Sequence, residues 1–355
     1  MTETRIILSL SGKRYAMTAL LCLIFLSGCV ISPRRTLGDG GGSTGGGGTA
    51  NGGKLYVTSG NTILRFDNAL SAAGNIAPGG TITGASTALS SPHALFIDTA
   101  TDRLYVANQN GRNVLIFAAA STATANVAPT ATVGSGSTGL SSPVAVAVDS
   151  GRNLLYVADG ITISIFTNAS ILTGNVNTAP AQSFITGFTI SGIFLDEPND
   201  TLYVSDATDN TVAIYQSANI QSGVGFANGT IVGIDTTLSQ PTGLVLDSAG
   251  RLIVSSPGGP NITAFANPTV ANGDVLPATI IKGNSTGLSS PQQMAATTAI
   301  TNGALFVADS GTSIVQIYTP ISTVTGTVNL TPSRQFSGAT TTLSSPTGIA
   351  LDSTR

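Results

Sequence analysis

The chain has 355 residues, with 14 basic and 17 acidic side chains and a formal net charge of −3. Charged residues make up only 9% of it, and its body holds no run of lysine or arginine, which excludes the basic surface of a nucleic-acid-binding protein. Tryptophan is absent, which disfavours a surface that binds nucleic-acid bases or sugars by aromatic stacking. Glycine is abundant, with 42 residues, which favours short strands joined by turns.

The N-terminal segment, residues 1–28, has the pattern of a targeting signal. Lys13 and Arg14 precede the apolar run AMTALLCLIFL, which is too short to span a bilayer comfortably. The sequence LSGC then follows and resembles the box at which bacterial lipoproteins are cleaved and lipidated. This resemblance implies that Cys29 carries a lipid and that the protein binds a membrane through it. An ordinary secretory signal or a short membrane anchor is the alternative.

Residues 29–53 are rich in glycine, and such a composition predicts a tether without helix or strand. The other cysteine, Cys22, lies in the segment that would be removed, so the mature domain is expected to hold neither a disulfide nor a free thiol. Val30, and not aspartate, follows Cys29, which in the lipoproteins that this signal resembles favours the outer membrane. We therefore expect a lipid-anchored protein of the bacterial cell envelope, at the outer membrane.

Residues 54–355 repeat one unit of about 50 residues six times. Its clearest feature is an apolar triplet of the LYV type, which begins at Leu55, Leu104, Leu155, Leu202, Leu252 and Leu305. Each triplet is followed by a strand pattern such as TILRF, a connection such as GNIAP, another strand such as GTITG, and a final pattern such as SSPVAVAVD. Four short strands in each of six units predict an all-β fold, a six-bladed β-propeller.

The last unit stops after its SSPTGIALD pattern, which in each blade is the first and innermost strand. The first triplet, at Leu55, has no such strand before it, because the glycine-rich stretch precedes it. We therefore predict that the C-terminal strand, Thr347 to Leu351, pairs with the first blade and closes the ring.

The unit P-x-G-[IL]-x-x-D, L-Y-V-[AS]-[DN], [VI]-x-[IV]-[FY] resembles the NHL repeat of β-propellers and, more loosely, the YVTN-type repeats of surface proteins. The resemblance covers nearly all of residues 54–355, with Pro241 to Asp247 among the best matches. The strand at Pro291 departs from it, since it lacks both the glycine and the closing aspartate. The resemblance implies scaffolds, protein-binding platforms and a few enzymes, so it does not fix an activity.

The residue two places after each triplet is small and polar in every unit. The series is Ser59, Asn108, Asp159, Asp206, Ser256 and Asp309. These side chains predict either a ring of oxygen ligands at a channel mouth, suited to calcium, or caps of the turn after each strand. Their recurrence in all six units favours turn caps. His93, the only histidine, is expected near the channel, but one histidine cannot build a multi-histidine metal site.

We expect a non-enzymatic, lipid-anchored propeller that binds an envelope or extracellular protein and needs no cofactor; no catalytic residue is assigned. The alternative is a lactonase-like hydrolase or lyase with a divalent cation, such as calcium, in its channel. The candidate channel-mouth ligands would then be His93, Asn108, Asp159, Asp206 and Asp309. An enzyme should show acidic residues that converge on the channel, whereas a binding module should show an exposed patch on one rim.

Overall fold

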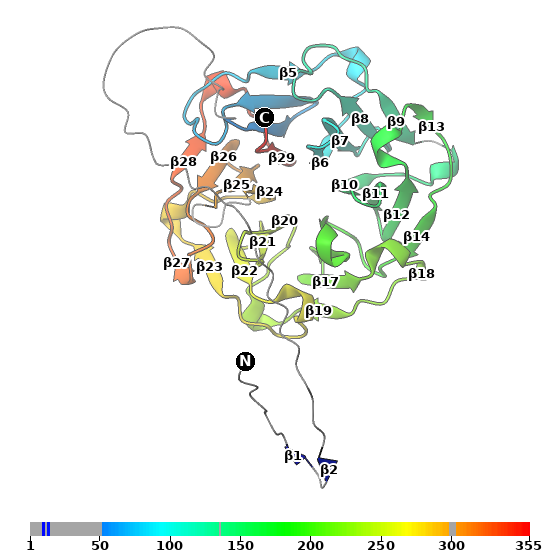
Figure 1. The fold of residues 1–355 in the computed structure, drawn as a ribbon. Coiled ribbons are helices and arrows are strands. Elements are labelled where there is room, and N and C mark those ends of the chain that lie inside the picture. Colours follow the sequence, from blue (N-terminus) through cyan, green and yellow to red (C-terminus); the bar gives the residue numbers. More distant parts are fainter. Residues whose placement is uncertain (1–8, 11–12, 15–51, 135, 298–302) are drawn as a thin grey trace, which may run out of the picture. The chain divides into compact units, whose positions relative to one another are not determined.

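The computed structural model describes residues 9–10, 13–14, 52–134, 136–297 and 303–355 (Figure 1). The chain divides into two units, Met1–Gly48 and Thr49–Arg355. In the first unit, the described residues form two short antiparallel strands, β1 (Ser9–Leu10) and β2 (Lys13–Arg14). Cys29, most of the predicted signal and nearly all of the predicted tether lie outside the described residues. Within the described part, no helix is long and apolar enough to cross a membrane.

The second unit is a ring of six small antiparallel sheets, one for each repeat, and is therefore a six-bladed β-propeller (Figure 1). From the channel outward, blade 1 contains β29 (Ile349–Asp352), β3 (Lys54–Ser59), β4 (Thr62–Asp67) and β5 (Gly80–Ile82). Blade 2 contains β6 (Pro92–Asp98), β7 (Arg103–Asn108), β8 (Asn113–Ala118) and β9 (Ala131–Gly134). Blade 3 contains β10 (Pro143–Asp149), β11 (Leu154–Asp159), β12 (Thr162–Thr167) and β14 (Gln182–Ile185).

The other half of the ring follows the same order. Blade 4 contains β15 (Gly192–Asp196), β16 (Thr201–Asp206), β17 (Thr211–Gln216) and β19 (Gly229–Ile231). Blade 5 contains β20 (Leu244–Leu246), β21 (Leu252–Ser256), β22 (Asn261–Phe265) and β23 (Thr279–Lys282). Blade 6 contains β24 (Pro291–Ala296), β25 (Leu305–Asp309), β26 (Ile314–Tyr318) and β28 (Arg334–Phe336).

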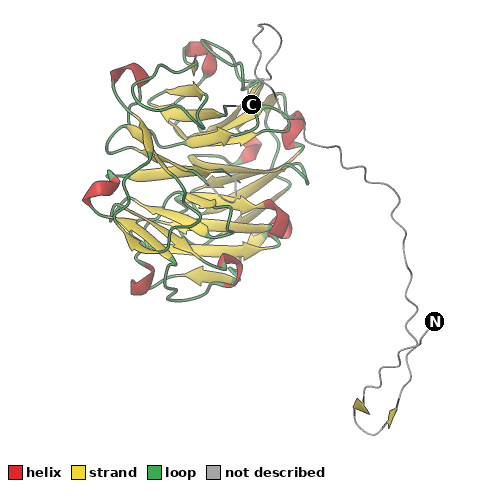
Figure 2. Cartoon of the chain, turned by 60° about the vertical axis from the view of Figure 1, so that its left-hand side comes forward, coloured by secondary structure: helices red, strands yellow, loops and turns green. Residues whose placement is uncertain are grey.

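Short 3₁₀ helices lie in the loops between these strands (Figure 2). They are η1 (Ala85–Thr87), η2 (Gly136–Thr138), η3 (Ala169–Ile171), η4 (Glu197–Asn199), η5 (Ala218–Ile220), η6 (Ile234–Thr236), η7 (Pro268–Val270), η8 (Asn284–Thr286) and η9 (Ala339–Thr341).

The core lies between the blades. The second strand of each blade is buried on both of its faces, as in β16, where all six residues are buried. A sheet that is covered on both sides needs apolar side chains on both faces, which explains why the LYV triplets are continuous apolar runs. Their tyrosines are fully buried, at Tyr56, Tyr105, Tyr156 and Tyr203.

The first and last strands of the domain share one sheet. Strand β29 pairs antiparallel with β3, and this places Ile349 opposite Val57 and Ala350 opposite Tyr56. Figure 1 shows the C-terminal strand beside the first blade. Thr58 strengthens the junction, because its hydroxyl oxygen accepts a hydrogen bond from the N–H of Gly348 at 2.8 Å.

The connection between the third and fourth strands of each blade pairs with the preceding blade, which the four-strand pattern does not predict. In blades 3, 4 and 6 it forms β13 (Gly174–Val176), β18 (Gly223–Val224) and β27 (Gly326–Val328), which pair parallel with the outer strand of the preceding blade. In the other blades a single bridge does the same: Gly74 with Phe336, Ala125 with Ile82, and Gly273 with Ile231. Every outer strand is thus partly covered, which blunts edges that would otherwise be open to pairing.

The polar residue that follows this bridge holds the preceding blade. In five blades its side-chain oxygen accepts the N–H of a residue in a 3₁₀ helix of the neighbour. The pairs are Asn75 with Thr340, Asn126 with Ser86, Asn177 with Ser137, Asp274 with Asp235, and Asn329 with Ser285. In five connections the asparagine or aspartate therefore joins two neighbouring blades.

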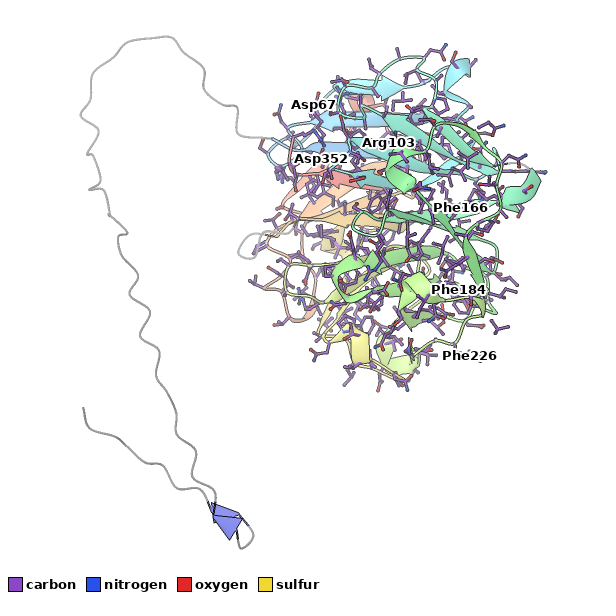
Figure 3. All side chains as sticks on the ribbon, turned by 45° about the vertical axis from the view of Figure 1, so that its right-hand side comes forward. Asp67, Arg103, Phe166, Phe184, Phe226 and Asp352 are labelled. Atoms are coloured by element: carbon purple, nitrogen blue, oxygen red, sulfur yellow. The ribbon has the colours of Figure 1, made fainter. Side chains whose placement is uncertain are left out.

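The two faces of the ring differ in which loops they carry. Lys54 lies opposite both Asp67 and Asp352 in the ladders of blade 1, so the domain begins on the face where each third strand ends. We call this the entry face, and Figure 3 shows Asp67 and Asp352 near each other there. The opposite face carries the loops before the inner strands.

Long side chains connect neighbouring blades along the entry face. Arg103 donates to the carbonyl oxygen of Leu172 at 2.9 Å, and Arg334 donates to that of Ala72 at 2.8 Å. Arg251 donates to the carbonyl oxygen of Val324 at 2.7 Å. These bonds join blades 2 and 3, 6 and 1, and 5 and 6.

Deletion of residues 346–355 removes β29 and exposes the inner edge of β3. We expect a loss of more than roughly 5 kcal/mol, comparable to the whole stability of a domain, because a buried strand and its ladder are lost together. Thermal unfolding followed by circular dichroism should lose its cooperative transition. The control is deletion of residues 353–355, which leaves β29 in place. It removes the Arg355 ion pairs and the two hydrogen bonds from Thr354 to Asp352, and should cost only about 1–3 kcal/mol. Equal melting of the two truncated chains would contradict the closure.

Candidate functional site: the central channel

The inner strands of the six blades converge on a central channel. The third residue of each P-x-G motif lies where the inner strands approach one another at the channel. These residues are Ala94, Ala145, Gly192, Gly243, Gln293 and Gly348. A Cβ on Gly348 would lie 2.6 Å from the carbonyl oxygen of His93, and one on Gly243 would collide with the carbonyl oxygen of Gln292. Small residues are needed here because the backbone of the next blade passes this close, which is the physical reason for the motif.

Gln293 is the exception, and its side chain crosses the channel. Its Oε1 atom accepts the N–H of Leu95 at 3.0 Å and the N–H of Ile349 at 2.9 Å, while its Nε2 atom donates to the carbonyl oxygen of Leu95 at 2.8 Å. One side chain of blade 6 therefore holds the inner strands of blades 1 and 2. The sequence shows that this strand lacks the glycine, but nothing in it indicates these cross-channel bonds.

Gln293 separates two cavities of different character. Toward the opposite face, the channel holds a small cavity of about 20 Å³. Its lining is partly polar and includes His93, Ser191, Thr242, Gln292 and Thr347. Toward the entry face lies a chamber of about 190 Å³. Apart from Gln293 its lining is apolar, with Phe96, Phe194, Met294 and Leu351 among the residues. Among the described residues, no aspartate or glutamate lines either cavity.

His93 lies on the polar side of the channel, as expected, and connects neighbouring blades there. Its Nδ1 atom lies 2.8 Å from the carbonyl oxygen of Val144, and its own carbonyl oxygen accepts the hydroxyl of Thr347 at 2.9 Å. Burial lowers the pKa of His93, and the hydrogen bond to Val144 only partly opposes this shift. The neutral ring, with its proton on Nδ1, therefore donates across the interface between blades 2 and 3.

The polar series predicted from the sequence lies one residue to a blade, and most members cap the loop on the opposite face. Asp309 accepts the N–H groups of Ser289 at 2.8 Å and Ser290 at 3.1 Å. Asp159 accepts those of Ser141 and Ser142.

Asn108 and the two serines follow the same pattern, since Asn108 accepts the N–H of Ser90 at 2.6 Å. The serine pairs are Ser59 with Ser344 and Ser256 with Ser239.

Asp206 differs from the rest of the series, because it accepts the N–H groups of Thr208 and Asp209 in its own turn. The structure does not bring the series together with His93. In the parts of the domain that are described, no group of three or more histidine, cysteine, aspartate or glutamate side chains is placed to hold a metal ion. The geometry of these residues is that of turn caps.

Comparison with known proteins gives the fold. No family model matches the chain, and no curated protein matches it in sequence. Among solved structures, a chain of the "Crystal structure of Nidogen/Laminin Complex" matches with a TM-score of 0.58 and 15% identity, over 84% of this chain and 98% of that one. A functionally unknown protein from Desulfotomaculum acetoxidans DSM 771 matches with a TM-score of 0.51 and 13% identity, over 81% and 80% of the two chains.

This chain folds as a β-propeller. At these identities the likeness establishes the fold alone, and the NHL type of the repeat stays a resemblance of motif.

Four apolar side chains of blades 3 and 4 are exposed near the opposite-face ends of their strands. They are Ile161, Ile185, Val232 and Ile234, which we call the opposite-face patch. Ile234 is 89% exposed and begins η6 in the loop after blade 4. The residues that begin η1, η8 and η9 in the corresponding loops are Ala85, Asn284 and Ala339. Ile234 thus departs from the repeat, whereas the turn caps follow it.

Replacement of Gln293 by leucine tests its role as a link across the channel. The change removes three hydrogen bonds and leaves the N–H groups of Leu95 and Ile349 without this acceptor, which should cost about 1–3 kcal/mol. Denaturant unfolding measures the difference. The matched control is Gln292→Leu, since the Gln292 side chain bonds only to Ser290 in its own loop. Equal effects of the two substitutions would show that Gln293 is no link.

The lowered pKa of His93 predicts a pH dependence of stability. Below about pH 6.5, His93 is protonated in the unfolded chain but stays neutral in the folded protein. The free energy of unfolding should therefore fall as the pH drops from 7 to 5. His93→Asn cannot titrate and should flatten the curve over this range, while the carboxylates act mainly at lower pH. An unchanged slope in the variant, measured by denaturant unfolding at each pH, would contradict a neutral buried His93.

Proposed function

We propose that this protein is a lipid-anchored β-propeller of the bacterial cell envelope, at the outer membrane, that acts as a non-enzymatic protein-binding module. The lipid attached at Cys29 holds it to the membrane, and the propeller presents the opposite-face patch to an envelope or extracellular protein. In this proposal the protein needs no cofactor.

The opposite-face patch is the observation that carries the proposal. Large apolar side chains that depart from the repeat and remain exposed are typical of interaction surfaces. The polar groups that could have served catalysis have structural partners instead: the turn caps bond backbone N–H groups, and His93 bonds Val144. A closed ring also suits a binding module, because it holds its loops in fixed positions.

Photo-crosslinking from the patch tests the binding role. A photoreactive residue at Ile234 should give a discrete cross-linked protein in intact cells. The same residue at Ala339, the corresponding position after blade 6, should not. The additional change Ile161→Ser should reduce the cross-link at position 234 several-fold. The absence of a cross-link at 234, or an equal one at 339, would contradict a protein partner at this patch.

The anchor is tested by Cys29→Ser. The unaltered protein should sediment with membranes and remain there after a high-salt wash, because a lipid holds it through hydrophobic transfer. The variant should lose its lipid, as read by mass spectrometry, and should no longer sediment after removal of its signal. Retention of a processed Cys29→Ser protein on washed membranes would contradict lipid anchoring.

A further inference from the structure

The connections after the third strands place one exposed side chain per blade at the same position of the repeat on the entry face. It lies five residues after the last aromatic residue of the strand. Blades 6, 1 and 2 carry hydroxyl side chains there, Thr323, Ser71 and Thr122. Blades 3, 4 and 5 carry Ile171, Ile220 and Val270, which are 66, 69 and 77% exposed. We call these three residues the entry-face ridge.

Packing of the connections does not explain why three blades carry apolar residues and three carry hydroxyl residues at this position. Two residues before the ridge position, every blade has a buried residue that seats the connection: Ala69, Ala120, Ala169, Ala218, Pro268 and Ile321. The seat is thus apolar all round the ring, whereas the exposed position changes character between one half and the other. Three neighbouring blades present apolar side chains to solvent at a position where serine or threonine is compatible with the fold.

The connections that carry the ridge contain a single charged side chain. The connections of blades 3 and 4, residues 167–181 and 216–228, hold no charged side chain. That of blade 5 holds Asp274, whose carboxylate accepts the N–H of Asp235. Inward of the ridge, Arg152 is paired with Asp149, and Glu197 and Asp200 add negative charge. This side of the entry face therefore has no excess of cations and is poorly suited to anionic headgroups.

The reach of the chain favours a bilayer as the occupant. The described domain begins at Gly52, on the same face as the ridge. Residues 30–51 separate this point from Cys29 and can span up to about 80 Å, so a lipid on Cys29 leaves the entry face within reach of the membrane. Confinement near the surface raises the effective concentration of the ridge there, so that weak insertion of a few side chains becomes significant.

We propose that the entry-face ridge inserts into the interfacial region of a lipid bilayer whose surface is electrically neutral, so that blades 3 to 5 rest on the membrane. This inference rests on the lipid anchor of the proposed function. Ile171, Ile220 and Val270 bury their apolar ends among the lipids, and the opposite-face patch remains free for a protein.

Fluorescence quenching on the intact lipidated protein tests the contact. In a Cys22→Ser background, an environment-sensitive dye is attached at Val270→Cys, and the protein is reconstituted in phosphatidylcholine vesicles with or without a lipid-borne quencher. The matched control carries the dye at Thr323→Cys, the same repeat position in blade 6. We expect a blue shift and quenching at 270 at least threefold stronger than at 323. Ile171→Ser and Ile220→Ser together should remove most of this difference.

The outcomes separate the two claims. Vesicle flotation of all variants with equal quenching at 270 and 323 overturns the ridge contact and leaves the anchor intact. Failure of the unaltered protein to float with vesicles overturns both. A blue shift at 270 in detergent without vesicles that grows with protein concentration assigns the ridge to a second copy of the chain and overturns the bilayer contact. Stronger quenching in vesicles with anionic lipids than in neutral ones contradicts the neutral surface.

Discussion

Each blade of this propeller has two apolar faces, and the structure depends on covering both of them. The middle strands are buried on both sides, so a blade is stable only between two neighbours. In a linear row the two end blades would each leave a face open. The ladder between β29 and β3 completes the first blade, and the contacts of blade 1 with blades 6 and 2 then close the row into a ring.

Neighbouring blades are held together at three places: the channel, the entry face and the perimeter. At the channel, Gln293 and His93 join inner strands of different blades. On the entry face, arginine side chains donate to carbonyl oxygens of the next blade. At the perimeter, each connection bridges the outer strand behind it. The perimeter bridges recur in every blade, so recurrence there indicates structure, and Gln293 and His93 are structural contacts that do not recur. Function is therefore to be sought at the exposed side chains that break the repeat, Ile234 and the entry-face ridge.

The repeat length, the order of strands and the inner position of the P-x-G strand could all be predicted, because apolar alternation and turn residues are local in sequence. The polar series at Asp159 and Asp309 could also be interpreted as turn caps, since a cap must recur with its turn. The cross-channel bonds of Gln293 could not, because they join residues about 200 positions apart. The exposure of Ile171, Ile220 and Val270 could not be predicted either, since an isoleucine in a loop is buried or exposed according to neighbours that only the closed ring supplies.

The central claim is that the ring is one cooperative unit sealed by its last strand. Native-state hydrogen exchange of the β29 and β3 amides tests this most directly, because it separates local opening from global unfolding. The account predicts that the hydrogen-bonded amides of β29 exchange with the same opening free energy as those of the buried strand β11. Exchange of β29 through a local opening several kcal/mol less costly, while β3 and β11 stay protected, would contradict it.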